Sequence, residues 1–187
     1  EGQLGDGTTT SRSSFVQIES NGVVAIEAGD FHSLYLKSNG SLWAMGSNLQ
    51  GQLGDGTTNN RITPVQVESS GVTAIAAGGW HSLYIKSNGS LWGMGSNSSY
   101  ELGLRLNSNH ATPTEIFPSS IYKVSATERA SFILKSDGSL WASGFLHKQF
   151  GDDLMINPTG ALHERITWGG NNNATATELA KSGSRSG

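Results

Sequence analysis

The chain has 187 residues, a formal net charge of −3 and no cysteine. The lack of cysteine excludes disulfides and thiolate metal sites. The 12 lysines and arginines are scattered along the chain, which argues against a general nucleic-acid binder with a basic patch. No stretch of about 18 apolar residues predicts a membrane span. With 25 glycines and 4 prolines, the composition is typical of a turn-rich β protein.

One sequence unit occurs three times at a constant spacing of 49 residues. The tryptophans Trp43, Trp92 and Trp141 keep this spacing. Two sets of glycines also keep it: Gly40, Gly89 and Gly138, and Gly46, Gly95 and Gly144. A repeat that holds its register without insertion indicates a fold built from repeated supersecondary units.

Each copy is expected to contain four short strands. In the first copy they are predicted, in chain order, over residues 14–18, 23–29, 32–37 and 41–46. The last two flank Asn39-Gly40, and an Asn-Gly pair between alternating apolar residues is the strongest short-range signal for a β-hairpin. The same turn is predicted at Asn88-Gly89 and Asp137-Gly138, and the first strand recurs over 63–67 and 112–116.

The predicted hairpins carry apolar residues on both faces. Leu34 and Leu36 alternate with Tyr35 in one strand, and the next strand places Trp43 beside Leu42. A sheet with one solvated face would be polar on that face, so these sheets must be covered on both. Four-stranded sheets stacked at a period of about 50 residues are typical of β-propeller blades. The predicted fold class is therefore all-β, an open partial propeller of about three four-stranded blades with a degenerate C-terminal segment.

The second copy resembles a known repeat. The run IAAGGWHSLYIKSNGSLWGMGSN (75–97), preceded by GQLGDGTTNNRITPVQV (51–67), is similar to the regulator of chromosome condensation repeat. The third copy departs from the pattern, because Ala130 stands where the first two copies have His32 and His81. The resemblance covers about residues 2–151 and implies propeller blades, about seven of which form a ring in that family.

The repeat divides the chain into two parts. Residues 1–151 are predicted to be three repeats, the first incomplete at its N-terminus, and 152–187 a degenerate or truncated fourth repeat, partly disordered. Because Glu1 falls inside a repeat, we expect a fragment of a larger propeller with an uncovered apolar face at each end. The expected partners are the remaining blades, further copies of the chain bound through these ends, and an unidentified protein.

No catalytic residue, cofactor or metal site is predicted. His32 and His81 begin equivalent strands, but a metal site needs converging ligands, and Ala130 interrupts the series. We expect both histidines to hydrogen-bond the backbone and pack between blades. The run GDGTT, at 5–9 and 54–58, lacks the lysine of a phosphate-binding loop and the spaced carboxylates of a calcium loop, so it is predicted to be a turn joining blades.

Two sets of aromatic positions are candidates for binding. Trp43, Trp92 and Trp141 are expected in the core between blades, the alternative being a stacking surface for bases or sugars. Trp80 aligns with Phe31 and Arg129 where a loop enters a strand. Because tryptophan and arginine often dominate binding energy at interfaces, these three aligned positions are the predicted contacts with a partner.

The predicted function is a non-enzymatic protein-interaction or scaffold module. The resemblance leaves two alternatives: a guanine-nucleotide exchange factor for a small GTPase with chromatin association, and a propeller that inhibits an enzyme. The copies contain neither the inserted hairpin nor the basic tail that the exchange activity implies. Nucleic acid is not expected as a direct partner. Near-identical copies with short polar turns resemble repeat arrays of secreted or surface proteins of bacteria, which favours that location but leaves the compartment open.

Overall fold

The computed structural model describes residues 1–145, and this part of the chain consists of strands and loops. In chain order the strands are β1 (Val23–Ala28), β2 (His32–Lys37), β3 (Leu42–Gly46), β4 (Arg61–Glu68), β5 (Val72–Ala77), β6 (His81–Lys86), β7 (Leu91–Gly95), β8 (His110–Phe117), β9 (Ile121–Ala126), β10 (Ala130–Lys135) and β11 (Leu140–Gly144). Within residues 1–145 no helix has the length and apolar character that a membrane crossing requires. The predicted fourth repeat over 152–187 lies outside the described residues.

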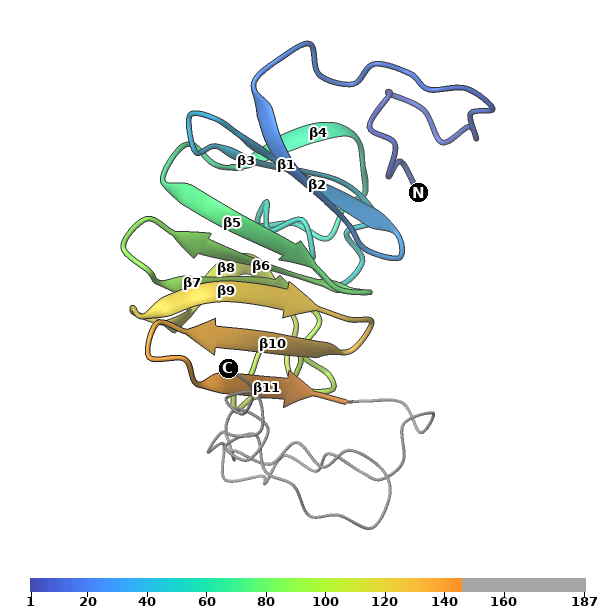
Figure 1. Ribbon diagram of the computed structural model, residues 1–187. Coiled ribbons are helices and arrows are strands. Elements are labelled where there is room, and N and C mark those ends of the chain that lie inside the picture. Colours follow the sequence, from blue (N-terminus) through green and yellow to red (C-terminus); the bar gives the residue numbers. More distant parts are fainter. Residues whose placement is uncertain (146–187) are drawn as a thin grey trace, which may run out of the picture.

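The strands form three antiparallel sheets stacked face to face (Figure 1). Sheet 1 has the strand order β1-β2-β3-β4 and sheet 2 the order β5-β6-β7-β8, while sheet 3 contains β9, β10 and β11 among the described residues. β1 packs against β5 and β5 against β9, so the first strands line the side on which the sheets converge. This stack of propeller-type sheets, which is not closed into a ring, confirms the predicted fold class.

The fourth strand of each sheet differs from the prediction. β4 pairs with β3 and β8 pairs with β7, so each complete sheet takes its last strand from the beginning of the next sequence copy. Residues 14–18, predicted as a strand, form none, and no strand among the described residues pairs with them. The prediction was wrong here because pairing, and not the period of the sequence, decides which strand belongs to which sheet.

The hairpin turns lie where the sequence predicts them. Gly40 has a φ of 79°, a left-handed conformation that residues with a Cβ atom rarely adopt. Asn39 stabilises the turn, because its Oδ1 accepts hydrogen bonds from the Ser41 backbone N–H at 3.0 Å and from the Ser41 hydroxyl at 2.8 Å. The same arrangement recurs at Asn88-Gly89 and Asp137-Gly138.

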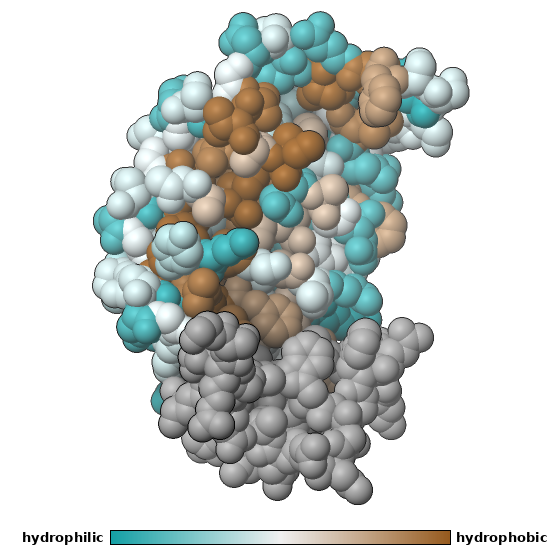
Figure 2. Space-filling model, in the orientation of Figure 1, coloured by the Kyte–Doolittle hydropathy of each residue, from teal (hydrophilic) through white to brown (hydrophobic). Residues whose placement is uncertain are grey.

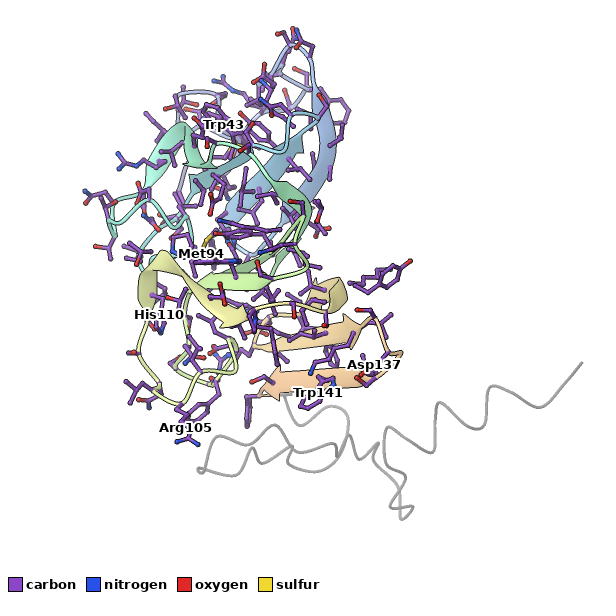
Figure 3. All side chains as sticks on the ribbon, turned by 90° about the vertical axis from the view of Figure 1, so that its left-hand side faces the viewer. Trp43, Met94, Arg105, His110, Asp137 and Trp141 are labelled. Carbon is purple, nitrogen blue, oxygen red and sulfur yellow. The ribbon has the colours of Figure 1, made fainter. Side chains whose placement is uncertain are left out.

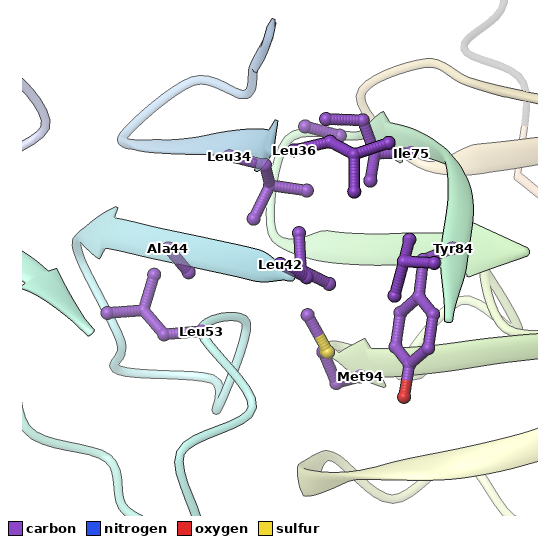
Figure 4. Packing of buried hydrophobic residues seen from close by; sticks show 10 residues of the cluster. Leu34, Leu36, Leu42, Ala44, Leu53, Ile75, Tyr84 and Met94 are labelled. Atoms are coloured by element: carbon purple, nitrogen blue, oxygen red, sulfur yellow. The ribbon is translucent and has the colours of Figure 1, made fainter. Parts of the chain in front are cut away.

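The core lies between the sheets. Between sheets 1 and 2, leucines of β2 and β3 meet apolar side chains of β5, β6 and β7, among them Leu34, Leu36, Leu42, Ile75, Tyr84 and Met94 (Figure 4). Between sheets 2 and 3, Leu83 and Leu91 pack in a second cluster with Ile121 and Ile133. Sheet 2 is therefore covered on both faces, as its apolar pattern predicts, and burying each of these side chains stabilises the fold by about 1.5–3 kcal/mol.

Candidate interaction site

His32 and His81 each link one sheet to the next. The side chains are fully buried, and His32 Nε2 lies 2.8 Å from the Ser82 hydroxyl of β6. That hydroxyl donates its proton to the Gln52 carbonyl at 2.8 Å, so it must accept the second bond, and His32 Nε2 must carry the hydrogen. His81 repeats the arrangement with Ser131 at 3.0 Å. The sequence led us to expect a backbone acceptor, whereas the structure places a serine of the next copy there.

Burial keeps both histidines neutral at pH 7. It lowers the pKa of His32 to about 4, and burial together with the nearby His32 lowers the pKa of His81 to about 3. Within residues 1–145, no group of three or more His, Asp or Glu side chains could hold a metal ion. The geometry of both histidines is that of a structural hydrogen bond between sheets.

A glycine lies against each buried imidazole. A Cβ atom on Gly29 would stand 2.4 Å from His32 Cε1, and one on Gly78 would stand 2.1 Å from His81 Cε1. The third copy has Thr127 at the glycine position and Ala130 at the histidine position, so both residues of the pair have changed together. Thr127 has a side chain where the first two copies have none, and it fits only because Ala130 is smaller than the histidine it replaces. The two changes can be recognised as a pair in the sequence only once the contact is known.

The repeated GDGTT run forms a turn closed by an ion pair. Asp55 accepts hydrogen bonds from the backbone N–H and hydroxyl of Thr57 at 2.9 and 2.7 Å, and Arg61 contacts its other oxygen at 2.6 Å. Partial burial raises the pKa of Asp55, but the bonds from Thr57 and Arg61 outweigh this and lower it below its usual value. The carboxylate is thus satisfied within the turn, and Asp6 is held in the same way by Thr8 and Arg12.

A second polar group joins sheets 1 and 2. The buried Tyr84 donates its hydroxyl proton to Glu68 Oε1 at 2.6 Å, and Lys86 Nζ lies 2.8 Å from the same oxygen. Burial, with the Glu68 carboxylate beside it, raises the pKa of Tyr84. The third copy replaces the acid by Phe117 and the tyrosine by Ile133, and its lysine, Lys135, instead lies over the rings of Phe117 and Trp141 at 4.7 and 3.9 Å.

Replacing Tyr84 with phenylalanine should lower the free energy of unfolding by about 1–2 kcal/mol, because it removes the hydrogen bond to Glu68 from a buried position. The matched control is Tyr35→Phe, since Tyr35 occupies the same place in β2 and makes no hydrogen bond of this kind; its effect should stay within about 0.5 kcal/mol. Urea unfolding of both variants measures the difference. Equal effects would show that Glu68 relies on Lys86 alone.

The repeated tryptophans are anchored by their own strands and lie half-buried. Trp43, Trp92 and Trp141 lie in the third strand of successive sheets, and each indole N–H donates to the serine two residues earlier, at 2.9–3.0 Å. Trp43 stacks on Tyr35 with ring centroids 6.1 Å apart. Figure 3 shows Trp43 and Trp141 at opposite ends of the stack. Trp92 packs against the core cluster between sheets 1 and 2. Trp141 packs against the cluster between sheets 2 and 3, where its ring meets that of Phe117 in β8 edge-on at 6.3 Å.

Phe31, Trp80 and Arg129 occupy equivalent places on one rim of the stack, just before β2, β6 and β10. Phe31 is 39% exposed and its ring centroid lies 4.8 Å from that of Trp80. Arg129 is exposed and contacts Glu128 at 3.3 Å. In every copy the carbonyl of this residue accepts a backbone hydrogen bond at 2.8 Å, from Ser47, Ser96 and Phe145 respectively. We call these three residues the variable rim.

The backbone beneath the variable rim is fixed by three glycines. Gly46, Gly95 and Gly144 have φ values of 108°, 98° and 115°. A Cβ atom on any of them would come within 2.5 Å of the carbonyl oxygen of the rim residue of its own sheet. The main chain therefore takes one conformation in all three copies, while the side chain that it presents changes from phenylalanine to tryptophan to arginine.

Comparison with known families identifies the repeat. A family described as Regulator of chromosome condensation (RCC1) repeat matches residues 39–85, and a second profile with the same description matches 23–52 and 72–101. Residues 23–101 carry RCC1 repeats. These matches confirm the resemblance drawn from the sequence, and they cover the two copies that keep the histidine. A comparison with curated protein sequences found no match.

Two solved structures contain a stack of sheets with the same fold as this chain. Human WBSCR16 matches 77% of this chain with a TM-score of 0.64 and 19% identity, and Prp20p from Saccharomyces cerevisiae matches 72% with a TM-score of 0.60 and 24% identity. The matches cover 40% and 33% of those two chains, so this chain spans well under half of either protein. Likeness at such identities concerns the fold alone.

Sequence reasoning missed the residues that join one RCC1 repeat to the next. Ser82 and Ser131, which receive the histidines, and Glu68, which receives Tyr84, were not singled out. The available signal was the third copy, in which several positions change together. Without the structure, nothing says which of those changes are in contact.

Proposed function

We propose that these RCC1 repeats form a non-catalytic protein-interaction module that binds its partner through the variable rim. The observation that carries the proposal is that Phe31, Trp80 and Arg129 change side chain on a backbone that is held identically in all three copies. Selection for packing alone would favour the same residue at each place, as it does at the tryptophans and turn glycines. A surface that differs along its length is suited to recognising one partner in one orientation.

The chemistry of the variable rim supports this role. Aromatic and arginine side chains contribute most of the binding energy at many protein interfaces, because they bury a large area and lose little conformational freedom. Phe31 and Trp80 already contact each other, so part of their ordering is complete before a partner arrives. The other conspicuous polar groups among the described residues, His32, His81 and Glu68, are occupied by bonds between sheets.

A photo-crosslinking residue placed at position 80 should form an adduct with a specific protein in the native host. The same residue at Thr73, which is exposed on β5 away from the rim, is the matched control. A genuine partner gives an adduct at 80 that disappears when Phe31 and Arg129 are both replaced by alanine. Identical adducts from positions 80 and 73 would contradict the proposal.

Nucleotide exchange is the competing function, since the structure of Prp20p is described together with its binding to Gsp1p and histones. A release assay with a small GTPase carrying a labelled nucleotide separates the two. We expect the release rate to stay at its intrinsic value when the chain is added at micromolar concentration. An acceleration of about tenfold or more would replace the interaction-module proposal by exchange activity.

A further inference from the structure

The sequence contains three Asn-Gly pairs, each preceded by a serine: Asn21-Gly22, Asn39-Gly40 and Asn88-Gly89. All three asparagines are exposed, and Figure 2 shows mainly hydrophilic side chains along the edge of the stack that carries the β6–β7 and β10–β11 turns, on the left in Figure 1. An asparagine before glycine can react with its own main chain, because glycine has no Cβ atom to hinder attack by its backbone nitrogen on the asparagine side chain. How readily each pair reacts therefore depends on how the fold holds it.

Two of these pairs are held in hairpin turns. The Gly40 N–H donates to the Lys37 carbonyl at 2.9 Å, and the Gly40 carbonyl accepts a bond from the next sheet at 3.0 Å. The side-chain oxygen of Asn39 is occupied by the two bonds from Ser41. The pair at Asn88-Gly89 is held in the same way. Attack by the glycine nitrogen requires these bonds to break, so it has to wait until the turn opens.

The third pair, Asn21-Gly22, lies in the connection that enters β1 and is not held in this way. Among the described residues the Gly22 N–H donates no hydrogen bond, and the side-chain oxygen of Asn21 accepts none. The side-chain nitrogen of Asn21 donates to the adjacent Ser20 hydroxyl at 3.2 Å. Within residues 1–145, neither the attacking nitrogen nor the carbonyl that it attacks is therefore restrained by a hydrogen bond.

This freedom belongs to the position in the sheet, because the equivalent residues of sheet 2 share it. Sheet 2 is packed on both faces, yet Gly71 donates no hydrogen bond among the described residues, and Ser70 is exposed like Asn21. The connection is thus a surface turn in both sheets. What is particular to the first copy is the asparagine, since the later copies have Ser70 and Ser119 at that place.

We propose that Asn21 is a site of spontaneous deamidation in the folded chain, whereas Asn39 and Asn88 are protected by the bonds of their turns. The Gly22 nitrogen forms a bond to the side-chain carbonyl carbon of Asn21, and the side-chain nitrogen leaves as ammonia with the proton that the Gly22 N–H gives up. Water then opens the resulting cyclic imide at one of its two carbonyls. One opening gives aspartate, and the other gives isoaspartate, in which the main chain runs through the side-chain carbons.

The reaction changes the charge and the main chain at the entrance to β1. The new carboxylate is close in sequence to Glu19, which pairs with Lys37 at 2.8 Å, and Lys37 Cε lies 3.5 Å from the place that a Cβ atom on Gly22 would take. Aspartate at position 21 therefore adds a second acid beside one lysine. Isoaspartate also lengthens the main chain directly before the Gly22 carbonyl, which accepts a bond from the Ser38 N–H at 2.8 Å.

Mass spectrometry of tryptic peptides from the full chain tests the proposal. Cleavage after lysine and arginine places the three pairs in separate peptides, residues 13–37, 38–61 and 87–105. When the folded chain is incubated in mildly alkaline buffer before digestion, Asn21 should convert at least about tenfold faster than the two hairpin asparagines, because each of those must first break the bonds of its turn. Rates at the hairpin sites equal to or above the rate at Asn21 would overturn the proposal.

The same incubation in urea is the control for the local sequence. Since all three pairs follow a serine, they should react at similar rates once the chain is unfolded. A preference for Asn21 that persists in urea would assign it to the sequence and would contradict protection by the fold.

Ser41→Ala tests the protection directly, because it removes the hydroxyl bond to the Asn39 side-chain oxygen. Conversion of Asn39 should rise by about threefold to tenfold relative to Asn88. The ratio is measured within the same molecules, so a general loss of stability, which exposes both sites, does not produce it. An unchanged ratio would show that the bonds of the turn do not protect the asparagine.

Discussion

Replacing Gly78 with alanine is expected to lower the free energy of unfolding by about 3 kcal/mol or more. The new methyl group would lie 2.1 Å from His81 Cε1, 2.5 Å from His81 Nδ1 and 2.6 Å from the Thr127 carbonyl oxygen. The imidazole cannot move away without breaking its bond to Ser131, and the carbonyl belongs to the backbone of sheet 3. The substitution therefore separates sheets 2 and 3, and a urea titration monitored by tryptophan fluorescence measures the loss.

Gly71→Ala is the matched control for this effect. Gly71 has a φ of 83°, and no atom lies within 4 Å of the place that an added methyl group would take, so alanine there suffers backbone strain without a clash. We expect a cost of about 1–2 kcal/mol at this site. Because Gly78 lies outside the left-handed region, its larger cost would come from crowding alone. A loss at Gly78 no larger than that at Gly71 would show that His81 is not held against the glycine.

The third copy explains why the crowding matters. It has lost the histidine and the glycine together, and it has also exchanged Glu68 and Tyr84 for Phe117 and Ile133. The glycine and the histidine lie in the same sheet, whereas Glu68 and Tyr84 join sheets 1 and 2, and in both cases the two partners of a contact changed together. Each pair therefore behaves as one packing unit, and a change at only one of its residues should be destabilising.

The sequence was sufficient for the elements and insufficient for their contacts. Asn39-Gly40 and its counterparts identify the hairpins, because the left-handed turn demands these residues locally. The strand at 61–68 was assigned to the wrong sheet, because its pairing with β3 is a contact that no local pattern encodes. The bond from His32 to Ser82 spans 50 residues and depends on the distance between two sheets, which the period of the repeat does not specify. The variable rim, in contrast, was visible as three aligned positions with different side chains, and its part in binding stays a prediction.

Acidification from pH 6.5 towards pH 4 is expected to destabilise the chain through His32 and His81. In the unfolded chain each histidine takes up a proton near pH 6.5, whereas burial lowers the pKa to about 4 for His32 and about 3 for His81 in the folded state. The unfolded state therefore binds more protons between these values, so stability is complete above pH 6.5 and is lost as the pH falls. Two histidines give a slope of up to about 2.7 kcal/mol per pH unit.

His81→Gln isolates one of the two contributions. The glutamine amide can still donate to Ser131 but does not titrate, so the slope of unfolding free energy against pH should fall to about half, near 1.4 kcal/mol per pH unit. Urea unfolding at about pH 7, 6 and 5 measures it above the range in which carboxylates such as Asp55, whose pKa is lowered, begin to contribute. Both slopes follow only if imidazolium cannot form between the sheets without breaking their contact. Equal slopes in the variant and the unmodified chain would mean that His81 is protonated within the folded state, and that the sheets open at that position before the chain unfolds.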